Sequence, residues 1–92
     1  MGNQRWIVEV GGEQHKVRVL HDFYPVPFRT KGELTVWLDN EIIYEITKNY
    51  FKSLVGAYPI KVGNTTLKIQ VRPPRLLSTT YHVFLEKDGK RL

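Results

Sequence analysis

The chain has 92 residues, of which 41% are hydrophobic and 12% aromatic, and it carries a formal net charge of +5 with no cysteine. We expect residues 1–92 to form a single domain, because this length is typical of one domain and too short for a large multi-site enzyme. The lack of cysteine excludes a disulfide framework, a thiolate-bound zinc and a cysteine nucleophile. No apolar run approaches the ~20 residues of a membrane span, and the first residues do not form a signal peptide. We therefore expect a soluble cytoplasmic domain in a reducing compartment, with no membrane association.

Apolar and polar residues alternate with a period of two through most of the chain. The alternating runs are 5–10, 16–19, 33–38, 42–46, 67–72 and 81–86. Because successive side chains of a strand point to opposite faces, each run predicts a strand with one face on a core and the other in water. The residues expected to be buried are Trp6, Val8, Val17, Val19, Leu34, Val36, Ile42, Tyr44, Ile69 and Val83.

Turn-forming residue pairs separate these runs. The pairs that accept positive φ, as two-residue hairpins require, are Gly11-Gly12, Asp39-Asn40, Gly63-Asn64 and Asp88-Gly89. They predict four hairpins and about eight strands. Pro25 and Pro27 indicate a longer irregular connection over residues 22–32, since proline would disrupt a central strand. Pro73-Pro74 indicates a second one before the last hairpin.

These elements predict an all-β fold, an antiparallel sandwich of two sheets, because eight short strands joined by hairpins need a second layer to cover the core. Residues 47–56 do not alternate. Their apolar residues fit either a short helical turn ended by Gly56 or a bent strand with a bulge.

The chain lacks a recognisable catalytic pattern. Ser53 and Ser78 do not lie in a glycine-flanked elbow. His15, His21 and His82 are far apart and show no metal-ligand spacing. The acidic residues fall in turns or at polar strand positions, and no glycine-rich loop precedes a helix to hold phosphate. We therefore expect a protein that is not an enzyme and that has no metal site and no cofactor.

Basic residues are concentrated in the second half of the chain. Residues 1–46 carry five basic and seven acidic side chains, whereas residues 47–92 carry nine and two. Either the acidic half neutralises the basic half across one sheet, or a basic face remains that attracts a polyanion. The residues predicted for such a face are Lys61, Lys68, Arg72, Arg75, Lys87, Lys90 and Arg91. Trp37 and Phe84 are the predicted exposed aromatics, which single-stranded nucleic acid would use for stacking.

Several segments carry a family resemblance when they are taken together and in order. They are Trp6-Ile7-Val8, His15-Lys16-Val17-Arg18-Val19 with His21, residues 32–39, Phe51-Lys52-Ser53-Leu54-Val55-Gly56, Ile60-Lys61-Val62-Gly63, residues 67–71 and residues 81–92. In this order they resemble one domain of the Fas apoptotic inhibitory molecule family. Asn40 stands where that family has a glycine after Asp39, and residues 22–32 differ from the family's pattern.

The resemblance implies an eight-stranded antiparallel sandwich without catalytic residues, acting in the regulation of apoptosis and signalling by protein contacts. It also implies that residues 50–55 form a strand or bent strand rather than a helix, and that Phe51, Leu54 and Val55 belong to the core. We therefore expect a binding module with an unidentified protein partner, present as a monomer or as a weak homodimer through a sheet edge. A nucleic-acid or polyanion-binding domain is the alternative.

Overall fold

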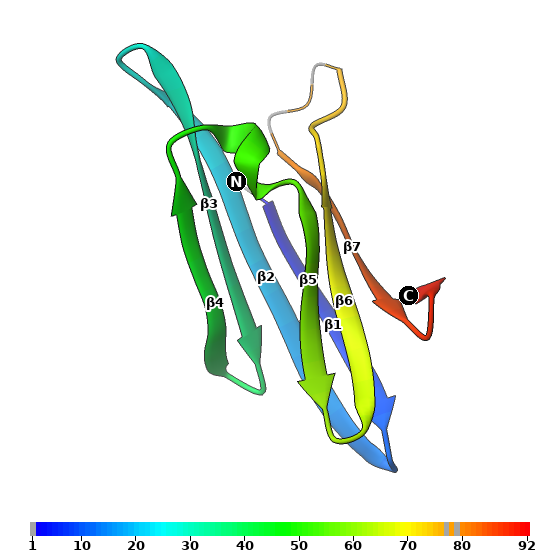
Figure 1. The fold of residues 1–92 in the computed structure, drawn as a ribbon. Coiled ribbons are helices and arrows are strands. Elements are labelled where there is room, and N and C mark those ends of the chain that lie inside the picture. Colours follow the sequence, from blue (N-terminus) through cyan, green and yellow to red (C-terminus); the bar gives the residue numbers. More distant parts are fainter. Residues whose placement is uncertain (1, 77, 79) are drawn as a thin grey trace.

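The computed structural model describes residues 2–76, 78 and 80–92, and it forms a sandwich of two four-stranded antiparallel sheets (Figure 1). The elements are β1 (Gly2–Val10), β2 (Glu13–Val26), β3 (Arg29–Leu38), β4 (Glu41–Lys48), the 3₁₀ helix η1 (Phe51–Leu54), β5 (Gly56–Val62), β6 (Thr65–Arg72), β7 (His82–Lys87) and β8 (Lys90–Arg91). One sheet has the strand order β1-β2-β3-β4 and the other β5-β6-β7-β8. This confirms the predicted fold class.

All four predicted hairpin turns are present. Both residues of Gly11-Gly12, Asp39-Asn40 and Asp88-Gly89 have positive φ, the requirement of a type I′ turn. In the fourth turn only Gly63 has positive φ, at 58°, which matches the first position of a type II′ turn. The connection that follows Pro73-Pro74 is irregular where the structure describes it, as predicted.

The prediction of an irregular connection over residues 22–32 is wrong. β2 continues to Val26 and pairs with β3 from Arg29 onward, so that only Pro27 and Phe28 form the turn. Pro25 is tolerated in β2 because the described residues of β1 pair with β2 only as far as His21, and Pro27 lies in the turn itself. Beyond His21 one side of β2 is an edge, where a missing N–H costs no ladder hydrogen bond.

Residues 51–54 form a 3₁₀ turn, so the strand or bent strand implied here by the family resemblance is wrong. Leu54 is fully buried and Phe51 packs against the core. Tyrosine hydroxyls satisfy two carbonyls of the turn: Tyr58 donates to that of Leu54 at 2.6 Å, and Tyr81 donates to that of Phe51 at 2.6 Å. The turn closes one end of the core against β3, where Gly32 leaves room for it.

The core lies between the two sheets and contains most of the residues predicted for it. The aliphatic residues confirmed as buried are Val8, Val17, Val19, Leu34, Val36, Ile69 and Val83. Trp6 and Tyr44 are only partly buried and pack against this core. Burial of Ile42 is wrong, since its side chain is 51% exposed. A bulge shifts the register between Val36 and Trp37, and it turns Ile43 inward in place of Ile42.

Candidate functional site: the basic face of the second sheet

The two halves of the chain form separate sheets, so their charges lie on opposite sides of the sandwich. The strands and turns of residues 2–48 carry six basic and seven acidic side chains, and those of residues 56–91 carry seven and two. The outer faces of two stacked sheets point away from each other. The acidic half therefore does not neutralise the basic half across one sheet, which was the first of the two alternatives.

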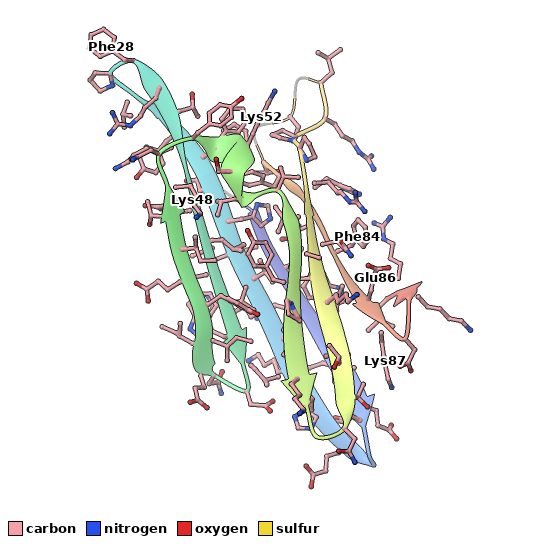
Figure 2. The ribbon with its side chains drawn as sticks, in the orientation of Figure 1. Phe28, Lys48, Lys52, Phe84, Glu86 and Lys87 are labelled. Carbon is pink, nitrogen blue, oxygen red and sulfur yellow. The ribbon has the colours of Figure 1, made fainter. Side chains whose placement is uncertain are left out.

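Strand alternation determines which side chains form the outer face of the second sheet. Leu67, Ile69 and Val71 of β6 are buried, as are Val83 and Leu85 of β7. The intervening residues therefore point outward, and the register places them in three cross-strand pairs: Lys68 with Glu86, Gln70 with Phe84 and Arg72 with His82. Figure 2 shows Phe84 and Glu86 pointing from β7 away from the other sheet.

Phe84 is the centre of this outer face because two guanidinium groups lie over its ring. The Cζ atom of Arg91, on β8, is 4.7 Å from the ring centroid, and that of Arg72 is 5.8 Å from it. The ring of His82 lies 5.6 Å from that of Phe84. The negative face of an aromatic ring attracts cations, so Phe84 holds both arginines in position without neutralising them.

A third arginine reaches the same cluster from the loop after β6. Nη2 of Arg75 lies 3.4 Å from Nε2 of His82. The pKa of His82 is lowered by partial burial first and then by the charges of Arg75, Arg91 and Arg72. His82 is therefore neutral at pH 7, and its ring nitrogen accepts a hydrogen bond from Arg75.

The positive charges of this cluster remain available for a ligand. Over the residues that the structure describes, Lys68, Arg72, Arg75 and Arg91 make no ion pair with a carboxylate. Glu86 is the nearest acidic residue by register, and its carboxylate accepts a hydrogen bond from the Gln70 side-chain amide. We name Lys68, Arg72, Arg75, His82, Phe84 and Arg91 the basic face.

Four of the seven predicted basic residues belong to the basic face, and the other three lie beside it or on the opposite side of the sheet. Lys61 lies on the outer side of β5, next to the basic face. Lys87 is in phase with the buried residues of β7, and its Nζ donates to the Glu9 carbonyl at 2.7 Å, so it connects the two sheets. Lys90 is the cross-strand partner of Lys87 and shares its side of the sheet. Lys87 and Lys90 are thus not part of the basic face.

The two predicted aromatics lie on opposite outer faces, and neither is fully exposed. Phe84 is half-buried beneath the arginines, and Trp37 is half-buried on the first sheet. Arg18, from the adjacent strand, has its Cζ 4.5 Å from the Trp37 ring centroid. The sequence reasoning missed this pair. An arginine and an aromatic at outward positions of neighbouring strands are the signal that could have found it.

A second polar cluster lies at the turn between β3 and β4. Nδ1 of His15 is 2.7 Å from Oδ2 of Asp39, and the Lys16 backbone N–H donates to Oδ1 of Asp39 at 2.8 Å. The hydrogen bond from Lys16, followed by that from His15, lowers the pKa of Asp39. These bonds fasten the turn to β2. Among the described residues no three histidine, aspartate or glutamate side chains are placed to hold a metal ion.

The part of the chain that the structure describes contains no helix with the length and hydrophobicity needed to cross a bilayer. Comparison of the chain with family models, curated proteins and solved structures gives no match.

Proposed function

We propose that this protein is a small non-enzymatic binding module and that the basic face is its main binding surface. The observation that carries the proposal is the gathering of Arg72, Arg75 and Arg91 around Phe84 and His82, with no ion pair to a carboxylate among the described residues. The ligand class with the matching chemistry is a polyanion, and single-stranded nucleic acid is the member of that class that offers both phosphates and stacking bases.

The arrangement supports phosphate binding because guanidinium groups present several N–H donors in a fixed plane. The Phe84 ring restrains two of these groups, so less side-chain entropy is lost when a phosphate binds. Bases stack on aromatic rings and on guanidinium planes, and both are present on this face.

The proposal is tested by fluorescence anisotropy with a labelled oligothymidine, titrated with protein over a range of salt concentrations. Four phosphate contacts predict a slope of log K against log[salt] of roughly −3, or about a fifty-fold loss of affinity between 50 and 200 mM salt. Substituting both Arg72→Gln and Arg91→Gln should make this slope smaller by about one to two. Arg5→Gln, an exposed arginine on the first sheet, is the matched control and should leave binding unchanged. Absence of binding by the unchanged protein at low salt would refute the nucleic-acid proposal.

A protein partner is the second candidate, and two observations favour it. The resemblance to the Fas apoptotic inhibitory molecule family implies function through protein contacts. On the outer face of the first sheet, Ile42 lies beside Trp37 in the register, and Ile7 is 65% exposed. Adjacent apolar groups that are at least partly exposed, such as Trp37 and Ile42, are typical of protein interaction sites. If Ile7→Thr or Ile42→Thr abolishes capture of a partner while Arg72→Gln and Arg91→Gln do not, the protein-binding candidate replaces the polyanion one.

A further inference from the structure

The hairpin of β2 and β3 projects beyond the rest of the sandwich (Figure 1). β4 ends where Lys48 pairs with Gly32, and β1 covers β2 only as far as His21. Phe28 in the turn is four positions before Gly32 in the sequence. At ~3.3 Å per residue the tip of the hairpin therefore stands roughly 13 Å past the end of β4.

Phe28 occupies this tip with an unfavourable backbone conformation, and its side chain makes no buried contact that would offset the cost. Its side chain is 106% exposed, and its φ is 70°. It follows Pro27 in the turn, a position that normally carries glycine or asparagine when φ is positive. A bulky residue with positive φ is strained, and strained residues cluster at sites of function. The exposure and the strain together indicate that Phe28 serves an interaction outside its own chain.

The end of the molecule behind Phe28 is basic and contains a further exposed aromatic group. Residues 23–32 and 47–56 include no aspartate or glutamate. Their basic residues are Arg29, Lys31, Lys48 and Lys52, and Figure 2 shows Lys48 and Lys52 at the same end as Phe28. Tyr50 is 53% exposed.

We propose that this end of the sandwich docks on an anionic membrane surface, with Phe28 inserted at the boundary between headgroups and acyl chains. This site is separate from the basic face and does not depend on the proposed function. Interfacial segments bury apolar side chains ~5–10 Å deep and hold basic residues among the anionic headgroups. With Phe28 at that depth, the ~13 Å projection of the hairpin leaves Lys48 and Lys52 within a Debye length of the lipid phosphates.

The shape of the site favours a lipid surface over a protein pocket. A single ring at the end of a projecting hairpin, with basic groups set back from it, requires only an apolar layer beneath a layer of negative charge. We expected no membrane association because the sequence has no apolar run of the length of a membrane span, and this mode of docking does not require one.

The test is co-sedimentation with sucrose-loaded vesicles of equal parts phosphatidylcholine and phosphatidylserine, compared with vesicles of phosphatidylcholine alone. The unchanged protein should pellet with the anionic vesicles and stay largely in solution with the neutral ones. Phe28→Asn keeps a residue suited to positive φ and should weaken binding by at least ~10-fold, because it removes the buried ring. The double variant Lys48→Gln with Lys52→Gln should weaken it by roughly 25-fold. Arg5→Gln removes an exposed basic side chain from the first sheet and should bind normally.

The proposal is overturned if the unchanged protein fails to pellet with anionic vesicles, the result expected when Phe28 instead fills a pocket of another protein. It is also overturned if Phe28→Asn binds as tightly as the unchanged protein. If Arg72→Gln with Arg91→Gln removes vesicle binding while Phe28→Asn retains it, the vesicles are held by the basic face, and the proposal again fails. Circular dichroism spectra of all variants should match, so that a loss of binding is not a loss of fold.

Discussion

Acidification should destabilise this protein through one buried histidine. His21 is 1% exposed; its Nε2 lies 2.7 Å from Oε1 of Gln4, and its ring stacks edge-on against Tyr81. Because the Gln4 oxygen is an acceptor, Nε2 carries the proton of the neutral ring. Among the described residues Nδ1 has no hydrogen-bond partner. A second proton on Nδ1 would thus create a charged, buried donor that has nothing to bond.

Burial lowers the pKa of His21 from 6.5 to about 4. The unfolded chain takes up this proton below pH 6.5, whereas the folded chain takes it up only near pH 4, so stability falls as the pH drops between these values. At pH 4.5 the loss relative to pH 7 is roughly 1–2.5 kcal/mol, the lower figure allowing for solvent screening. Nearby Asp22 acts in the opposite direction, since its carboxylate favours the protonated ring.

Urea unfolding at pH 7 and pH 4.5, followed by tryptophan fluorescence, measures this loss. The matched variant is His21→Phe, which keeps a ring against Tyr81 but cannot be protonated. This variant should be less stable at pH 7 because it loses the hydrogen bond to Gln4. Its loss of unfolding free energy between pH 7 and pH 4.5 should be roughly 1–2.5 kcal/mol smaller than that of the unchanged protein. Equal changes in the two proteins would refute the assignment to His21.

Three further predictions concern stability and are measured by thermal and urea unfolding. Gly32→Ala should lower the free energy of unfolding by ~1–3 kcal/mol, because a Cβ there would lie 2.2 Å from the Tyr81 hydroxyl and 3.0 Å from Cα of Phe51. An unchanged urea midpoint would mean that η1 does not pack against β3 as described. Ile69→Ala should lower the free energy of unfolding by ~2–5 kcal/mol, whereas Ile42→Ala, the same change at a 51% exposed site, should lower it by well under half of that. Similar losses in the two variants would contradict the outward orientation of Ile42 on β4. Phe28→Asn should raise the melting temperature by ~4–8 °C, since relief of the strained φ contributes ~1 kcal/mol; a lower melting temperature would show that Phe28 stabilises the fold.

The sequence predicted those parts of the fold that depend on local chemistry. Pairs such as Asp39-Asn40 are recognisable because few residues accept positive φ. The Pro27-Phe28 turn was missed because phenylalanine is not a residue that this rule selects. The bulge beside Trp37 was missed because it changes the period of the pattern by one residue, and Ile42 was therefore assigned to the wrong face.

For the candidate site, the basic count was available from the sequence but the arrangement was not. Whether opposite charges cancel depends on which strands share a sheet. The chain passes from the first sheet to the second at η1, between β4 and β5, and the sequence pattern did not show this crossing point. That Lys87 lies outside the basic face could have been predicted from the sequence. It alternates in phase with Val83 and Leu85, which indicates an inward position. The contact of Arg91 with Phe84 depends on the last hairpin folding back along β7, a tertiary feature that alternation does not report.

The sheet order has a consequence for how the chain folds. Every ladder joins strands that are consecutive in the sequence, and each sheet is complete on its own side of the short η1 connection. The entropy cost of forming each ladder is therefore that of closing a short loop, and β-proteins with mainly local pairing fold faster than those whose sheets interleave distant strands. The contacts between the two sheets, such as the hydrogen bond from Lys87 to the Glu9 carbonyl, join residues that are much farther apart in the sequence.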